Sequence, residues 1–421
     1  DNRLILLVLD MPWSERSRRA RERLWTHPEL VELVDDAFVA VRERADLRPG
    51  LVRRHPAPGL PAMSLLLPDG APLVFSRDGG GAAPVAFSSL DPQRVIDALK
   101  EADAYYREKG AEAVKESRQE LAAAGTEAIP RRGKSDPSVA IAVASALEDR
   151  YDPERRYFGG APRVPRLEAL ELLAASVVEM DGHWRGMFSG ALSQMLTGLT
   201  DPEDGGLYSL ARGLDWEDPE PVKLLSINAA TLELLAVAET TVPGDEGFSE
   251  SAGRLAGFLI GRLGDDDGGF VTAMAPACPG GRCDTVISGE TARAAAALIR
   301  AGEAFEEKAW TARGLEAARF VREARYGKRR GVVRSVVDGF AVPPGTIVLD
   351  DLAASTWAFL AAHAATGERA WLDAAKDLAD TAVRNLAHGK SGVLADMLIS
   401  PTGPAALRQA TSTRHKATSA S

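Results

Sequence analysis

The N-terminal part of the chain places its hydrophobic residues in short runs of strand length. LILLVL (residues 4–9) is continuously apolar, which is typical of a strand buried on both faces. HPELVELVDDA then has helical spacing and FVAVR alternates, so the order is strand, helix, strand. LPAMSLLLPDGAPLVF predicts two strands joined by a tight turn at Pro68–Gly70, and a helix capped by Asp91 follows. This order predicts an α/β domain over residues 1–110.

From residue 138 onward, helical spacing of alanine and leucine dominates. We expect about nine helices, near residues 138–149, 166–181, 187–197, 222–239, 249–263, 288–305, 309–324, 350–365 and 370–387. Glycine-based turns recur between them with a period of about sixty residues, in YFGG, DGGLY, DGGF, RGVV and SGVL. Two helices per period predict stacked α-hairpins, which would close into an α/α toroid over residues 138–400 with a pocket at the end where the turns gather. Residues 111–137 are expected to be a helical extension and linker, and residues 401–421 a disordered tail.

The composition argues against several classes of partner. The formal net charge is −10, so no large basic field is available to attract nucleic acid or an anionic membrane. No apolar stretch reaches the roughly 18–20 residues that span a bilayer, and no signal peptide is visible. We therefore expect a cytoplasmic protein. Because the chain begins at Asp1, just before a strand, a targeting signal ahead of it stays open.

The chain has two cysteines, Cys278 and Cys283, within CPGGRC. They are too few for a disulfide framework and too few for a four-cysteine zinc site. We expect two thiols in a loop, with a reversible disulfide as the alternative. No phosphate-binding loop and no complete EF-hand pattern occurs, and no cofactor or metal is expected.

Several stretches carry a resemblance that covers nearly the whole chain. They are WTHPELVELVDDAFVAVRERADLRP, GLPAMSLLLPDGAPL, YDPERRYFGGAPRVPRLEALELL, DGGLY, DWEDPEPVKLLSINAATL and LDDLAASTWAFLAAHAATGERAWLDAAKDLA. The chain resembles the thioredoxin domain-containing family typified by spermatogenesis-associated protein 20. The resemblance implies a thioredoxin-like domain followed by a six-hairpin toroid related to N-acylglucosamine 2-epimerases and glycosidases.

The first domain departs from that family where its chemistry should lie. The family usually carries Cys-x-x-Cys after the first strand, whereas this chain has DMPWSERSRR. Thiol–disulfide exchange needs an attacking thiolate and a resolving thiol, and neither Ser14 nor Ser17 can serve as either. Pro61 aligns with the family's proline beside the redox motif, which is usually cis and can keep a structural role. We therefore expect a redox-inactive domain.

The resemblance also implies a toroid pocket whose polar positions have mostly changed. EPVKLLSINA stands where the family has His-Phe-Glu-Lys-Met-Leu-Tyr-Asp-Asn-Ala, so Lys223 and Asn228 match while Glu220 replaces the histidine. Tyr208 takes a histidine position, and Glu290 falls within a replaced Trp-Asn pair. In the first turn of its helix, Glu290 is also expected from the helix dipole alone.

Two acidic groups are the remaining candidates. Asp350 and Asp351 match the family at the start of a helix, where they either face the pocket or cap free N–H groups. Asp215 and Trp216 lie in DWEDPEP, which is either an aromatic platform with carboxylates for a sugar or an exposed loop.

Two functional hypotheses follow. The first is a binding or scaffold protein with a degenerate carbohydrate-type pocket, because the cysteine pair and most catalytic positions have changed together. The alternative is an enzyme of carbohydrate metabolism, epimerase-like or glycosidase-like, that acts through Asp350, Asp351 or Glu220. The toroid is expected to lack its last hairpin, which would expose apolar helix faces. Either a protein partner or self-association covers these faces, or the sequence is a fragment.

Overall fold

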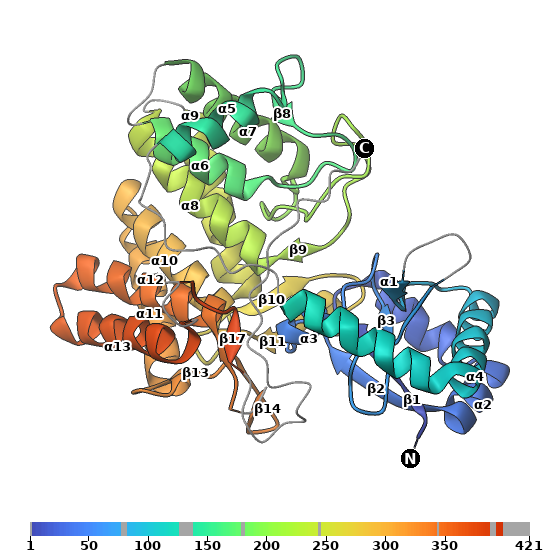
Figure 1. Cartoon of the computed structure of the whole chain (residues 1–421). Helices are drawn as coiled ribbons and strands as arrows, with labels where there is room; N and C mark the ends of the chain where they lie inside the picture. Colours follow the sequence, from blue (N-terminus) through green and yellow to red (C-terminus); the bar gives the residue numbers. More distant parts are fainter. Residues whose placement is uncertain are drawn as a thin grey trace. The chain divides into compact units, whose positions relative to one another are not determined.

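The computed structural model describes residues 2–76, 82–125, 138–177, 182–242, 246–342, 345–387 and 393–398. The chain divides into two compact units (Figure 1). The first comprises Asp1–Arg132, Val337–Leu349 and Val383–Ser421, and the second comprises Gly133–Val336 and Asp350–Ala382. The predicted tail, the first two residues of the SGVL turn and residues 126–137 of the predicted extension and linker lie outside the described residues.

The first unit is built on a mixed four-stranded sheet. Its strands are β1 (Leu4–Asp10), β2 (Phe38–Arg44), β3 (Ala62–Leu66) and β6 (Ala86–Phe87), in the order β2-β1-β3-β6. β1 runs parallel to β2, whereas β3 is antiparallel to both β1 and β6. Helix α2 (Pro28–Ala37) connects the parallel pair, and the long helix α4 (Pro92–Gly125) follows the sheet. The predicted order of strand, helix and strand is therefore confirmed.

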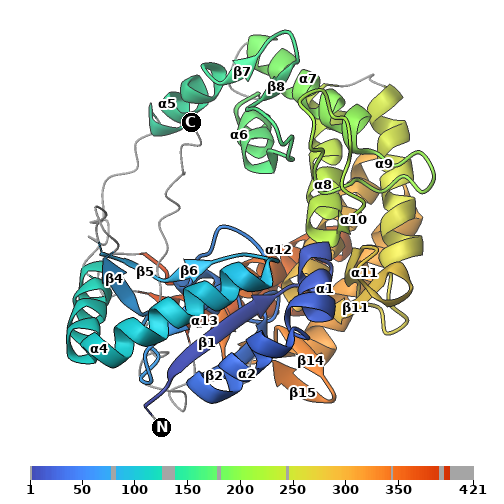
Figure 2. The same ribbon diagram turned by 90° about the vertical axis from the view of Figure 1, so that its right-hand side faces the viewer.

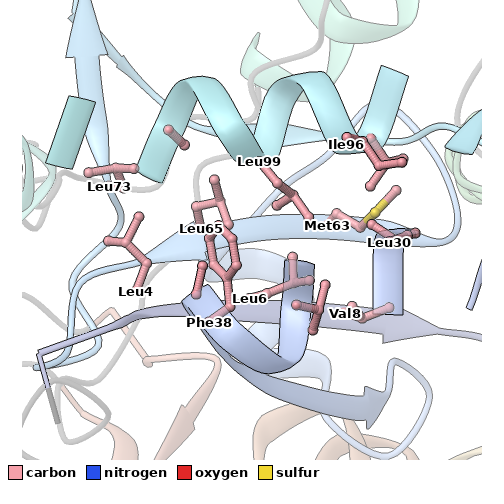
Figure 3. Close-up of a cluster of buried hydrophobic side chains, with 14 of the residues drawn as sticks. Leu4, Leu6, Val8, Leu30, Phe38, Met63, Leu65, Leu73, Ile96 and Leu99 are labelled. Atoms are coloured by element: carbon pink, nitrogen blue, oxygen red, sulfur yellow. The ribbon is translucent and has the colours of Figure 1, made fainter. Parts of the chain in front are cut away.

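Both faces of the central strand are buried. On one face Leu4, Leu6 and Val8 pack against side chains of α2 and α4, such as Leu30 and Leu99 (Figure 3). On the other face, alternate residues of β1 join a smaller cluster that contains Leu7, Leu9, Ala45, Ala62 and Leu66. In Figure 2, α4 crosses the sheet above β1. The continuous apolar run LILLVL reflects this two-sided burial.

The tight turn at Gly70 and the helix cap at Asp91 that the sequence predicts are both present in the structure. The turn after β3 is closed by a hydrogen bond from the Gly70 amide to the Leu67 carbonyl oxygen, at 2.8 Å, and Gly70 has a φ of 87°. The Asp91 carboxylate accepts from the Gln93 amide at 3.0 Å at the start of α4. The helix continues past residue 110 with a kink at Lys109, so the expected helical extension is present up to Gly125.

The segment after β1 is held by serine hydroxyls. Ser14 caps helix α1 (Glu15–Arg19) by accepting from the Ser17 amide at 3.2 Å. The fully buried Ser17 hydroxyl accepts from the Met11 amide, also at 3.2 Å. The Leu60–Pro61 peptide bond is cis. The hydroxyls of Ser14 and Ser17 therefore fix the backbone after the first strand, in a segment that contains no thiol.

The second unit is a succession of helices. They are α5 (Ser138–Glu148), α6 (Leu167–Val177), α7 (Gly182–Leu199), α8 (Leu225–Thr241), α9 (Glu246–Phe258), α10 (Ser288–Ala304), α11 (Lys308–Phe320), α12 (Leu349–Thr366) and α13 (Arg369–Leu386). Each of the predicted helical segments coincides with one of them. Three of the starts differ by three residues or more: α7 begins at Gly182 rather than near 187, α8 at Leu225 rather than at 222, and α9 at Glu246 rather than at 249. The start of α8 shifts because Lys223 and Leu224 form strand β9 and pair with Met274 and Ala273.

Shorter elements connect these helices and complete the first unit. The second unit has a small sheet of β9 (Lys223–Leu224), β10 (Val271–Met274) and β11 (Arg282–Val286) in the order β11-β10-β9. The remaining strands are β4 (Val74–Ser76), β5 (Ala82–Pro84), β7 (Tyr151–Asp152), β8 (Tyr157–Phe158), β12 (Tyr326–Gly327), β13 (Gly331–Val332), β14 (Ser335–Val337), β15 (Phe340–Val342), β16 (Ile347–Val348) and β17 (Met397–Leu398). Short helices are α3 (Pro49–Arg54), η1 (Ala20–Leu24), η2 (Leu259–Leu263), η3 (Pro279–Gly281) and η4 (Val321–Arg325).

Small residues allow the helices to pack closely around α10. α10 contacts α8 on one side and α11 on the other (Figure 1). Its alanines Ala294–Ala297 are completely buried. In α11, a Cβ on Gly314 would come within 2.7 Å of the Ala295 carbonyl oxygen, so only glycine permits this approach. In the described part of the chain, no helix has both the length and the apolar character needed to cross a membrane.

Candidate functional site

A cavity of about 580 Å³ lies among four helices of the second unit. We call α6, α8, α10 and α12 the inner helices because their side chains line it. Small residues leave the space free, and five larger polar or aromatic side chains project into it. These five are Glu171, Glu233, Arg293, Arg300 and Trp357. The volume is within the range of small-molecule pockets, about 300–1,000 Å³.

Helical spacing brings these side chains to one face of each inner helix. On α8, Ala230, Glu233 and Val237 follow one another at intervals of about one turn. On α10, Arg293 and Arg300 are about two turns apart, and all residues between them are buried. The alanines that surround these charges pack against neighbouring helices. The charged side chains of these helices line the cavity, and Arg293 is also 47% exposed.

Three inner helices contribute to one interacting cluster. The Trp357 indole N–H donates to Glu233 Oε1 at 3.0 Å, and Arg300 Nη1 pairs with the same oxygen at 2.6 Å. The Arg300 guanidinium carbon lies 5.1 Å from the centre of the Trp357 ring, which is a cation–π contact. Trp357 remains 44% exposed. The indole is thus held by a carboxylate and a guanidinium while much of its surface stays available to a ligand.

A second ion pair and a separate carboxyl complete the lining charges. Arg293 Nη2 binds Asp350 Oδ1 in the first turn of α12. Burial opposes the charged form of Arg293, but Asp350 and nearby carboxylates raise its pKa. The pKa of Glu171 is raised, first by burial and then by the negative charges of Glu233 and Glu168, while Arg293 lowers it. A carboxyl with a raised pKa holds its proton to a higher pH than an ordinary glutamate does.

Asp350 and Asp351 have different environments although they are adjacent. Asp350 reaches the cavity through Arg293, and its side chain is 45% exposed. Asp351 is 1% exposed and accepts from Arg334 Nη1 at 2.8 Å and from the Gly289 amide. Burial, first, and then the charge of Asp350 raise the pKa of Asp351 against these contacts. The Asp351 carboxylate therefore joins the start of α10 to Arg334, and it does not line the cavity.

Tyr208 and Lys223 belong to a buried ion-pair cluster outside the cavity. Lys223 Nζ lies 2.6 Å from both Asp201 Oδ2 and Asp204 Oδ1, and the Tyr208 hydroxyl donates to Asp201 at 2.7 Å. Burial raises the pKa of Asp201, but hydrogen bonds from Lys223 and other donors outweigh it and hold the pKa at about 2. This cluster ties the DGGLY turn to strand β9.

Asn228, Gly205 and Gly206 also have structural roles at the DGGLY turn. The completely buried Asn228 side chain exchanges hydrogen bonds with the Leu207 amide and carbonyl, at 2.7 and 3.1 Å. A Cβ on Gly205, whose φ is 79°, would approach the Arg254 carbonyl oxygen to 2.9 Å. One on Gly206 would approach the Phe258 ring to 2.6 Å. Asn228 therefore holds the loop against α8, and the glycines allow it to pack against α9.

The remaining sequence candidates also lie away from the cavity lining. Trp216 packs edge-to-face on Tyr157 with ring centres 4.7 Å apart, and Asp215 forms an exposed ion pair with Arg155 at 3.0 Å. Glu220 and Glu290 are partly exposed near the starts of α8 and α10. The structure therefore does not bring the candidates Tyr208, Asp215, Trp216, Lys223, Asn228, Glu220 and Glu290 together with the cavity-lining cluster.

Our sequence reasoning missed the five side chains that project into the cavity. A signal was nevertheless present, since Arg293 and Arg300 interrupt an alanine-rich helix with the spacing of one face. Glu233 likewise interrupts a run of apolar residues in α8. Isolated charges on otherwise apolar helices are rare in cores and indicate a polar cavity.

The expectation of two free thiols is wrong. Cys278 and Cys283 form a disulfide, with Cα atoms 5.2 Å apart. The two positive-φ glycines between them, Gly280 and Gly281, fold the loop tightly enough to bring the cysteines together. Within the described ranges, no group of three or more histidine, cysteine, aspartate or glutamate side chains is arranged to hold a metal ion.

Comparisons with known proteins show the fold of the helical part. No protein-family profile matches the chain, and no curated protein matches its sequence. Among solved structures, cellobiose 2-epimerase from Bacillus thermoamylovorans is similar, with 13% identity, a TM-score of 0.51, and 60% of this chain and 71% of that chain covered. A D-mannose isomerase has 12% identity and a TM-score of 0.48, with 55% of this chain and 63% of the isomerase covered. The structural neighbours are of the α/α toroid type.

Proposed function

We propose that this protein binds a small carbohydrate-like ligand in the cavity between the inner helices. The observation that carries the proposal is the Trp357 indole, which is partly exposed and held by Glu233 and Arg300 inside a cavity of about 580 Å³. An aromatic face can cover the apolar face of a sugar ring, while carboxylates and guanidinium groups bind its hydroxyls. The names of the similar structures, an epimerase and an isomerase of sugars, agree with this ligand class.

We also propose that the first unit is a thioredoxin-like domain without redox activity. The sheet order β2-β1-β3-β6, with β1 and β2 parallel and β3 antiparallel, supports this assignment together with the sequence resemblance. Ser14 and Ser17 occupy the segment after β1 and form structural hydrogen bonds. Neither can form a thiolate, so thiol–disulfide exchange has no nucleophile there.

Binding is favoured over turnover because the cavity's arginines are already paired. Arg300 binds Glu233, and Arg293 binds Asp350. Neither guanidinium is therefore free to stabilise negative charge that develops on a reacting sugar. The alternative is an enzyme of carbohydrate metabolism, and Glu171 favours it, because a carboxyl with a raised pKa can act as a general acid. A protein partner or self-association, expected from the incomplete ring, stays a prediction.

The test is calorimetric titration of the full chain with monosaccharides. Trp357→Ala should weaken binding by about tenfold or more, because the stacking surface is lost. Trp310→Ala is the matched control, since Trp310 on α11 contacts Phe305 and does not line the cavity. Failure of every sugar to bind, or equal affinity of both variants, would overturn the proposal. Turnover of a bound sugar that Glu171→Gln abolishes would favour the enzymatic alternative.

A further inference from the structure

One carboxylate oxygen organises the aromatic side of the inner-helix cavity. Glu233 Oε1 accepts from the Trp357 indole N–H at 3.0 Å and from Arg300 Nη1 at 2.6 Å. The Arg300 guanidinium carbon also lies 5.1 Å from the centre of the Trp357 ring. The three side chains come from α8, α10 and α12, and all of them line the cavity. Each of the three is therefore in contact with the other two.

The Glu233–Arg300 pair uses one atom of each side chain. Arginine and carboxylate groups frequently pair through two parallel hydrogen bonds, which occupy both oxygens and two nitrogens. Here the Trp357 N–H and Arg300 Nη1 share Glu233 Oε1. Among the residues that the structure describes, Glu233 Oε2 accepts no hydrogen bond, and Nε and Nη2 of Arg300 donate none. The pair therefore keeps an acceptor and donors for a ligand although its geometry is already fixed.

Exposure and charge decide which ligand groups suit this pair. The side chains of Glu233 and Arg300 are 28% and 36% exposed, so both can be reached from the cavity. Because the carboxylate and the guanidinium neutralise each other, a charged ligand group would have to compete with one of them for the other. A neutral hydroxyl meets no such competition, since it can donate to Glu233 Oε2 or accept from Arg300. The pair is therefore suited to uncharged hydroxyls.

We propose that Glu233 and Arg300 are the specificity-determining residues of this cavity, and that they bind two adjacent hydroxyls of a ring that stacks on Trp357. This inference rests on the proposed function, since it names the residues that distinguish ligands in the same cavity. One hydroxyl donates to Glu233 Oε2, and its neighbour accepts from Arg300. The bond from the Trp357 N–H to Oε1 fixes the carboxylate relative to the stacking surface, so ring and hydroxyls are bound in one orientation.

The experiment removes one ligand hydroxyl at a time. The full chain is titrated calorimetrically with glucose, mannose and their monodeoxy derivatives. Loss of either of two adjacent hydroxyls should weaken binding by about tenfold or more, because a charged side chain then loses a hydrogen bond. Loss of any other hydroxyl should weaken binding by less than about threefold. This comparison uses the unmodified protein, so it does not depend on the folding of a variant.

Variants then assign each hydroxyl to its residue. In Glu233→Gln, removing the hydroxyl that donates to Oε2 should weaken binding by less than about threefold, because the charge-assisted bond is already lost. Arg300→Gln should do the same for the neighbouring hydroxyl. Glu239→Gln is the matched control, since Glu239 lies on the same helix as Glu233 and does not line the cavity. It should keep the full dependence on both hydroxyls.

The outcomes separate this inference from the proposed function. A purely structural role of Glu233 would weaken all the sugars equally in Glu233→Gln and leave the dependence on the two hydroxyls unchanged. That result would overturn the inference, and so would equal sensitivity of the unmodified protein to every hydroxyl. In both cases the sugars still bind, so the proposed function stands. If no sugar binds, the proposed function itself fails.

Discussion

Replacing Asp351 with alanine should destabilise the second unit far more than replacing its neighbour Asp350. Asp351 is 1% exposed, and its partner Arg334 has a side chain that is only 10% exposed, so Asp351→Ala removes the carboxylate of a buried ion pair. The variant also removes an acceptor from the Gly289 amide at the start of α10. Asp350 and Arg293 are 45% and 47% exposed, and solvent screens their pair.

The expected free-energy changes differ several-fold. Removing one partner of a buried ion pair costs about 3–5 kcal/mol. Loss of the acceptor at a helix start adds about 1 kcal/mol. An exposed pair contributes about 0–1 kcal/mol. We therefore expect Asp351→Ala to lower the free energy of unfolding by about 4 kcal/mol or more, and Asp350→Ala by less than about 1 kcal/mol.

Urea denaturation followed by circular dichroism measures both variants, and a double variant tests the cause. If the cost arises from the loss of the Asp351–Arg334 ion pair, Arg334→Ala combined with Asp351→Ala should be less destabilising than the sum of the single changes. Equal stability of Asp350→Ala and Asp351→Ala would refute the reasoning, and so would additive effects of the two changes. A loss of ligand binding in Asp351→Ala would not identify a pocket residue, because unfolding produces the same loss.

Two further outcomes are expected from other parts of the second unit. Replacing Cys278 and Cys283 with alanine should lower the free energy of unfolding by about 2 kcal/mol, as expected for a short closed loop, and a dithiol reductant should lower it only in the unmodified chain. Urea titrations with and without reductant measure both effects. Lys223→Met should raise the pKa of Asp201 from about 2. Because this pKa is depressed in the folded state, its stabilisation is present above about pH 4 and is lost as the pH falls toward 2. In Lys223→Met, the free energy of unfolding measured between about pH 2 and pH 4 should therefore depend less on pH. An unchanged dependence would contradict the assignment of the low pKa of Asp201 to Lys223.

Local sequence patterns predicted the elements well, because their causes are local. The helices from α5 to α13 follow from the spacing of alanine and leucine, and the turn at Gly70 and the cap at Asp91 follow from backbone and hydrogen-bond preferences of single residues. The start of α8 could not be predicted in this way. Lys223 and Leu224 have helical neighbours in the sequence but extend because strand β10 offers them hydrogen bonds.

Local sequence patterns did not identify the side chains that line the cavity. Lys223 and Asn228 were expected at the pocket, yet the first is buried between Asp201 and Asp204 and the second holds the backbone of Leu207. Helical spacing shows which residues share a face, but it does not show which neighbouring helix or loop covers that face. From the sequence alone, a polar residue near the start of a helix that binds a ligand therefore cannot be distinguished from one that supports a loop.

The amino-acid sequence by itself determined the type and order of the elements, the two-sided burial of β1 and the absence of a thiol after it, because these depend on residues close together in the chain. Only the tertiary structure decided which charges meet. Glu233, Arg300 and Trp357 come from three helices far apart in the sequence, and Asp350 and Asp351 differ because neighbouring helices cover one and leave the other partly open. The physical reason is that burial and electrostatic pairing depend on distances in space, which helix packing sets.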